Sequence, residues 1–109
     1  MRELAPDLQQ VERLPAGGLI VTARRHAGGV VSRYFAPAFG IPEDPVTGSA
    51  HCTIGPCWRA ELGPTLRAHQ ASSRGGDLTV ITTTAGRVLL AGTARTAAAG
   101  LLTLPPPRG

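Results

Sequence analysis

One stretch in the middle of this chain carries the apolar periodicity of a long α-helix. Between Thr47 and Leu62, apolar residues recur at spacings of three and four residues and form a single stripe: Ala50, Ile54, Cys57, Trp58 and Leu62. Gly63 and Pro64 follow as a natural stop. Pro56 predicts a kink, because proline removes one backbone hydrogen bond. A single helix with one apolar face requires another layer to cover that face.

The segments on both sides of this helix are typical of β-strands. Short runs rich in β-branched or alternating residues predict strands at 19–23, 30–35, 66–71, 77–83, 87–91 and 93–102. Residues 6–14 favour a short helix or turn, and the prolines and glycine of residues 36–46 predict an irregular but restricted loop. Strands, a central helix and strands again predict an α+β fold, with a curved, mostly antiparallel sheet around one helix.

Length and composition limit the classes of function. A chain of 109 residues fits one domain, predicted over 1–104 and followed by a Pro-rich tail at 105–109. The formal charge is +4, but the basic residues are all arginines scattered along the chain, and aromatic residues make up 4%. A nucleic-acid interface needs basic residues clustered among aromatic ones, so this class is disfavoured. No apolar run is long enough to cross a membrane and no secretory signal begins the chain, which favours the cytoplasm.

The cysteines and histidines do not predict a metal site or a disulfide. Cys52 and Cys57 are five residues apart and face different sides of the predicted helix, so we expect them to be buried small residues rather than a bridge. His51 and Cys52 are adjacent and diverge, and no further pair has metal-ligand spacing. We expect His51 near a pocket mouth or packed against the preceding loop, and His26 and His69 in solvent.

The start of the central helix is the strongest candidate for chemistry. Helix N-termini present unpaired N–H groups and favour anions, and Gly48 allows a ligand to approach the backbone closely. Asp44 lies four residues upstream in a proline-restricted loop, and Thr47 and Ser49 add two hydroxyls. Asp, Thr and Ser before an apolar helix are also ordinary caps, each worth about 1 kcal/mol. Spacing alone favours the capping interpretation.

Longer stretches of the sequence resemble one protein family. They are Leu4–Leu8, Arg33–Pro37, Gly40–His51, Gln70–Gly76, and Arg87-Val88 leading to Gly92–Ala94. In this order they are similar to the C-terminal half of the phenazine-biosynthesis PhzF-like isomerases and epimerases. The central stretch, Gly40–His51, is long enough to be specific, and the similarity covers nearly the whole chain.

The resemblance implies a diaminopimelate-epimerase-like fold, in which two similar halves enclose the active site. Members move protons on small carboxylated substrates without a metal or organic cofactor. The position of Thr47 corresponds to a catalytic cysteine of the related epimerases, so thiol chemistry is not expected here. The implied catalytic residues are Asp44, which would orient or share a proton with the substrate, and Ser49. The implied substrate-binding residues are Thr47, Gly48, Ser49, Ser72, Arg74, Gly75 and Gly76.

The sequence also departs from the family pattern. Members are more than twice as long, their principal acid/base glutamate belongs to the first half, and that half's Gly-Asn-Pro motif is missing from this chain. We therefore expect half an active site, which would work with a separate N-terminal half or as a homodimer whose copies imitate the two halves. The alternative is a non-catalytic remnant that binds a carboxylate or a protein partner.

Overall fold

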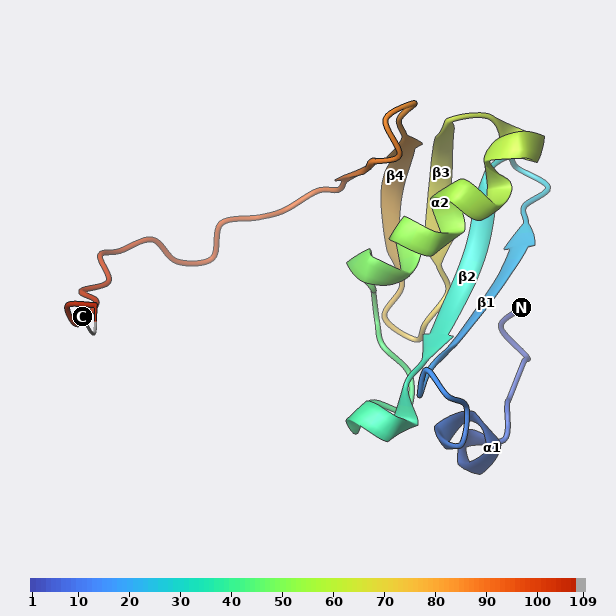
Figure 1. Cartoon of the computed structure of the whole chain (residues 1–109), viewed down its shortest axis with the longest axis horizontal. Helices are drawn as coiled ribbons and strands as arrows, with labels where there is room; N and C mark the ends of the chain where they lie inside the picture. Colours follow the sequence, from blue (N-terminus) through green and yellow to red (C-terminus); the bar gives the residue numbers. More distant parts are fainter. Residues whose placement is uncertain (108–109) are drawn as a thin grey trace.

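The computed structural model describes residues 1–107, which form a five-stranded sheet with one long helix against one face (Figure 1). In chain order the elements are α1 (Leu8–Glu12), β1 (Leu19–Arg24), β2 (Val30–Phe35), a 3₁₀ helix η1 (Pro37–Phe39), α2 (Gly48–Leu62), β3 (Thr65–Gln70), β4 (Gly76–Thr82) and β5 (Val88–Ala91). The bounds of α2 and of all five strands agree with the predicted ones to within one residue. No helix in the described part of the chain is both long and apolar enough to span a membrane.

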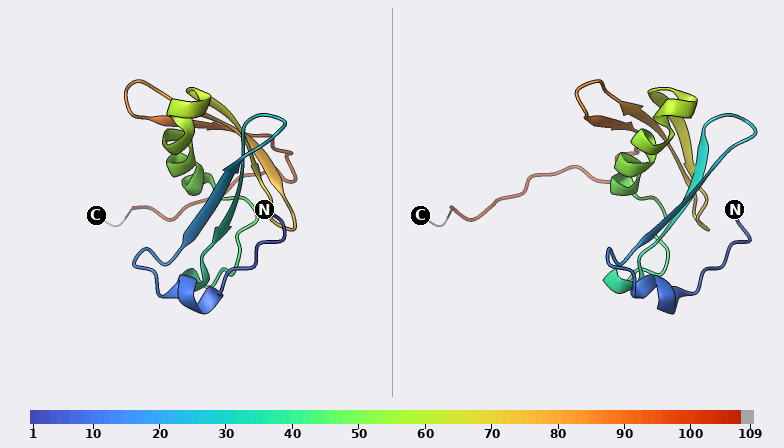
Figure 2. Two further views of the ribbon diagram at one scale, coloured as in Figure 1. Left: turned by 90° about the vertical axis from the view of Figure 1, so that its right-hand side faces the viewer. Right: turned by 45° about the vertical axis from the view of Figure 1, so that its right-hand side comes forward.

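The sheet has the strand order β1-β2-β3-β4-β5. Neighbouring strands are antiparallel except β2 and β3, which pair in parallel from Val30 opposite Ala68 to Ser32 opposite Gln70. Two parallel neighbours need a crossover between them, and α2 lies in that connection. Figure 2 shows the sheet curving around the face on which α2 lies. The predicted α+β fold, with a mostly antiparallel sheet around one helix, is confirmed.

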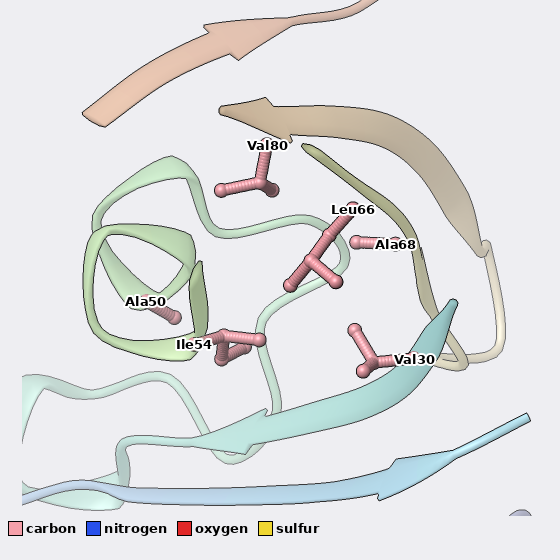
Figure 3. Close-up of a cluster of buried hydrophobic side chains, with 6 residues drawn as sticks. All are labelled: Val30, Ala50, Ile54, Leu66, Ala68 and Val80. Carbon is pink, nitrogen blue, oxygen red and sulfur yellow. The ribbon is translucent and has the colours of Figure 1, made fainter. Parts of the chain in front are cut away.

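The core lies between α2 and the concave face of the sheet. Its buried members are Val30, Ala50, Ile54, Leu66, Ala68 and Val80, which point toward one another in Figure 3. Trp58 and Leu62 pack against this cluster from further along α2. A Cβ on Gly55 would come within 2.7 Å of Val80 Cγ1. The missing side chain therefore lets α2 approach β4 closely.

The cysteines of α2 do not lie where the sequence analysis expects them. Cys52 and Cys57 are both exposed free thiols. The buried face of α2 includes His51 and Gly55 as well as Ala50 and Ile54. Its centre is therefore rotated away from Cys57, which falls at the solvent edge of the apolar stripe. The expectation that both cysteines are buried is wrong.

The predicted last strand, 93–102, does not form. Residues 92–107 have no regular secondary structure, are exposed throughout and run away from the sheet (Figure 1). The segment from Ala94 to Gly100 is mostly alanine and glycine, which have low strand propensity, and it has no neighbouring strand to pair with in the described part of the chain. Of the predicted Pro-rich tail, Pro105–Pro107 are exposed, and residues 108 and 109 lie outside the described residues.

Candidate active site

The segment that carries Asp44, residues 42–47, includes the end of the predicted loop and is held to the sheet at its centre. The backbone N–H of Asp44 donates a hydrogen bond to the carbonyl of Tyr34 at 3.0 Å. Beside it, Arg33 donates from Nε and from a terminal nitrogen to the two carboxylate oxygens of Glu43, each at 2.8 Å. A bidentate guanidinium–carboxylate pair fixes both position and orientation. The backbone around Asp44 is therefore anchored to β2 from two directions.

Arg33 also anchors the first residues of the chain. Its remaining terminal nitrogen donates to the carbonyls of Met1 at 3.1 Å and Arg2 at 3.3 Å, and to that of Leu4. The hydrogen bonds to Glu43 raise the pKa of Arg33 above its ordinary value; the negative charge of Glu43 adds to this effect, and partial burial opposes it. The guanidinium thus keeps its charge and joins the N-terminal segment, β2 and the loop.

Gln70, at the end of β3, joins the backbone and the side chain of the loop that precedes α2. It is fully buried, with a relative exposure of 0%. Its Oε1 accepts from the backbone N–H of Thr47 at 2.7 Å, and its Nε2 donates to the carbonyl of Asp44 at 2.9 Å. An N–H only donates and a carbonyl only accepts, so these two partners fix which end of the amide is which.

The same amide orients the hydroxyl of Thr47. Gln70 Nε2 also donates to Thr47 Oγ1, at 3.1 Å. A hydroxyl that accepts this bond still has a proton to donate, and its other contact is Oδ2 of Asp44. The Thr47 hydroxyl therefore donates a hydrogen bond to the side chain of Asp44. In the described part of the chain no hydrogen bond engages Oδ1 of Asp44.

The geometry at the start of α2 differs from an ordinary cap. Thr47 occupies the N-cap position with an extended backbone, but its side chain makes no capping hydrogen bond. Gly48 and Ser49 follow and are exposed. The first N–H groups of a helix have no partner within the helix. The hydroxyl that would cap them is turned toward Asp44, so the capping interpretation does not describe Thr47.

The predicted neighbouring loop, residues 72–76, packs against the segment that carries Asp44. The Ser72 hydroxyl donates to the carbonyl of Pro45 at 2.7 Å and accepts from the N–H of Gly75 at 2.9 Å. A Cβ on Gly76 would lie 2.2 Å from Val46 Cγ2, so glycine is needed for the contact. Both ends of this loop therefore touch residues 45 and 46, although the Ser72 hydroxyl is already occupied within the chain.

The predicted site residues divide between two cavities. Gly48 and Gly76 line a cavity of about 380 Å³ together with Leu90. Ser72, Arg74 and Gly75 line a different one of about 360 Å³. No residue lines both. Among the described residues, Asp44, Thr47 and Ser49 line neither of these two cavities; Asp44 and Thr47 are half-buried, and Ser49 is exposed.

The histidines play separate structural roles. His51 is fully buried, and its Nδ1 donates a hydrogen bond to the carbonyl of Thr47 at 2.7 Å. Of the two expected positions for His51, the structure shows the one packed against the preceding loop. His69 lies 2.8 Å from Asp77 and is only partly exposed, whereas a solvated side chain is predicted. His26 is exposed. Within residues 1–107, no three His, Cys, Asp or Glu side chains are grouped closely enough to hold a metal ion.

Comparison with known families identifies the chain. The family model for phenazine biosynthesis-like proteins, PhzC-PhzF, matches residues 1–100. The chain belongs to this family. A family member from Pseudomonas aeruginosa, named an uncharacterized isomerase, is 52% identical over 79 residues, which are 72% of this chain and 30% of that protein. The phenazine biosynthesis-like domain-containing protein of Rattus norvegicus is 45% identical over 93 residues, or 79% of this chain and 32% of that protein.

Part of a solved structure of the family has the same fold. The crystal structure of a PhzF family protein from Enterococcus faecalis matches this chain with a TM-score of 0.80 and 41% identity, covering 89% of this chain and 38% of that one. The chain thus spans about a third of the length of the relatives it matches. Family members occur in bacteria and in mammals, so membership alone does not indicate a bacterial source.

Two groups of this candidate site were not predicted: Gln70, and the pair of Arg33 with Glu43. The sequence contained a signal for the first. Leu66, Ala68 and Gln70 alternate along β3, which places a glutamine on the apolar face of the strand. A buried polar side chain requires hydrogen-bond partners, so this position indicates a structural network.

Proposed function

We propose that this chain is one part of a cofactor-independent isomerase or epimerase that moves protons on a small carboxylated substrate. The observation that carries the proposal is the Asp44 carboxylate, oriented by Thr47 and Gln70 beside the uncapped start of α2. An anchored base next to an anion-favouring helix end suits proton transfer at a carbon near a carboxylate. That several relatives are named isomerases supports the same reaction class.

Each group then has a defined role. The backbone N–H groups of Gly48 and Ser49 bind the substrate carboxylate, and the Ser49 hydroxyl assists. Oδ1 of Asp44 takes a proton from the substrate or returns it. Thr47 holds Oδ2 and keeps the carboxylate oriented. The loop of Ser72, Arg74, Gly75 and Gly76 borders the site on its other side.

A proton shift needs a second acid/base group on the opposite side of the substrate. Glu43 is close in sequence, but Arg33 engages both of its oxygens. We therefore assign the second group to a partner: a separate N-terminal half, or a second copy of this chain. The partner would complete the site without adding a metal or organic cofactor.

The test is a chimera in which this chain replaces the matching segment of the Enterococcus faecalis relative. Proton exchange into D₂O, followed by NMR on a panel of small carboxylates, is compared with the parent protein. We expect the chimera to exchange the compounds that the parent exchanges, and Asp44→Ala to reduce the rate by about 10²-fold or more. A folded Asp44→Ala chimera with full exchange would remove Asp44 from the mechanism.

Carboxylate binding can be tested on the chain alone. A Cβ at Gly48 would meet Leu90 Cδ1 at 3.7 Å, an ordinary contact, so Gly48→Ala should leave the fold intact. Acetate should shift the amide NMR signals of residues 48–50 in the unmodified chain and shift them less in the variant. Unchanged affinity in Gly48→Ala would argue against this binding site.

A second candidate is a non-catalytic binding remnant, possibly a homodimer. It is favoured by large apolar side chains left exposed on β5 and beyond it: Leu89, Leu90, Leu101, Leu102 and Leu104. Exposed apolar patches are typical of protein contact surfaces. Light scattering gives the molar mass in solution. A dimer that exchanges no substrate protons, together with an inactive chimera, would favour this candidate over the isomerase.

A further inference from the structure

A second cavity lies on the face of the sheet opposite α2. Along β3 the residues facing α2 are Leu66, Ala68 and Gln70, so His69 points to the opposite face. There it lines a cavity of about 360 Å³ together with Arg2, Arg33, Glu43 and Arg74. This cavity shares no lining residue with the one beside Gly48.

The charges around this cavity do not balance. Of the described residues that line it, Glu43 alone carries a carboxylate, and both of its oxygens are paired with Arg33. The ring of His69 faces Asp77, which lies outside the lining. Arg2 and Arg74 are exposed and form no ion pair within residues 1–107. Two positive charges therefore face one small cavity without a counter-charge.

The backbone that carries these two arginines is tethered. Arg33 binds the carbonyls of Met1, Arg2 and Leu4, which holds the N-terminal segment at the cavity. The Ser72 hydroxyl joins Pro45 to Gly75 and so fixes the turn in which Arg74 lies. Little backbone entropy remains to be lost when a ligand binds between them.

We propose that this cavity binds an anionic group, a phosphate or a carboxylate, between Arg2 and Arg74. Guanidinium groups match the geometry of both anions and bind them with strong, charge-assisted hydrogen bonds. The volume is at the small end of ligand sites, which suits a single charged group of a metabolite. The site does not depend on the isomerase proposal, because none of its groups takes part in proton transfer.

The test is an NMR titration of the ¹⁵N-labelled full chain with inorganic phosphate and, separately, with acetate. We expect saturable shifts at the amides of residues 72–75 and at least a fivefold loss of affinity in Arg74→Gln and in Arg2→Gln. Arg87→Gln is the matched control, since Arg87 is exposed and does not line the cavity, and this variant should bind the anion as the unmodified chain does. The anion that binds more tightly identifies the group.

Two results would overturn the proposal. One is the absence of saturable shifts at residues 72–75, or an equal loss of affinity in Arg74→Gln and Arg87→Gln. The other is a loss of phosphate binding in Gly48→Ala, which would place the anion at the start of α2. Retained phosphate binding in Gly48→Ala supports the cavity, whatever that variant does to acetate binding at residues 48–50. Failure of this site and failure of the isomerase site are therefore distinguishable.

Discussion

Two segments without strand or α-helix, residues 42–47 and residues 92–107, differ sharply in how the rest of the chain holds them. The first is mostly polar residues and prolines, yet Tyr34, Arg33 and Gln70 all bind it. The second contains leucines, yet it is exposed along its whole length. The comparison indicates that a segment is held in place by the partners that the rest of the fold brings to it, and not by its own composition.

The largest loss of stability should come from removing the side chain of Gln70, which binds residues 44 and 47. Gln70→Leu leaves the N–H of Thr47 and the carbonyl of Asp44 buried without partners, and we expect it to lower the free energy of unfolding by about 3 kcal/mol. Urea denaturation measures this. Gln9→Leu, at an exposed position of α1, is the control and should change stability by less than about 0.5 kcal/mol. A Gln70→Leu protein as stable as this control would break the comparison.

A smaller loss is expected when the loop is released from β2. Arg33→Met leaves Glu43 without its partner and frees the N-terminal segment, at a cost of about 2 kcal/mol, because charged hydrogen bonds are stronger than neutral ones. The amide of Asp44 should also exchange its hydrogen faster. Arg87→Met, an exposed arginine of the β4–β5 turn, serves as the control. Unchanged exchange at Asp44 would show that Tyr34 and Gln70 suffice to hold the loop.

The Thr47 hydroxyl can be removed with almost no change in shape. Thr47→Val deletes its bonds to Asp44 and Gln70, and we expect a loss of about 1 kcal/mol, with Thr47→Ser restoring most of it. In the chimera, Thr47→Val should also slow proton exchange while leaving acetate binding at residues 48–50 unchanged. Equal exchange rates in Thr47→Val and the unmodified chimera would mean that the hydroxyl does not orient Asp44.

The smallest change in stability should come from removing most of the exposed C-terminal segment. Truncation after Thr93 removes a segment whose described residues, 94–107, are all exposed, so the free energy of unfolding should change by less than about 0.5 kcal/mol. A fall of more than 1 kcal/mol, growing with protein concentration, would show that the segment packs against a second copy of the chain. Like residues 42–47, this segment would then be held by contacts with other residues, but those residues would belong to a second copy of the chain.

Much of the local structure follows from the sequence. Apolar periodicity places α2 and the five strands to within one residue, because the spacing of buried side chains follows the geometry of each element. The contiguous stretch from Asp44 to Ser49 gives the centre of the candidate site. The sequence also leads to two wrong expectations: a strand at 93–102, and burial of the two cysteines. Both depend on where other elements lie, which periodicity does not encode.

The site is less predictable than the elements that carry it. The resemblance implies that Gly48, Ser72 and Arg74 bind one substrate; in the structure Gly48 lines one cavity, and Ser72 and Arg74 line a neighbouring one. Gln70 and Glu43 carry little local signal of their partners. Their importance emerges only when Thr47 and Arg33 are brought beside them.

The sequence by itself determined the helix, the strands and the rigid loop, because each depends on residues within a few positions of one another. The tertiary structure decided which polar groups meet. The parallel pairing of β2 with β3 brings Gln70 to Thr47, 23 residues earlier in the chain. Contacts between distant parts of the chain also bring Arg2 and Arg74 to one cavity, where neither forms an ion pair within residues 1–107. Such contacts depend on strand order and crossover, and a long-range hydrogen bond has no periodicity along the chain.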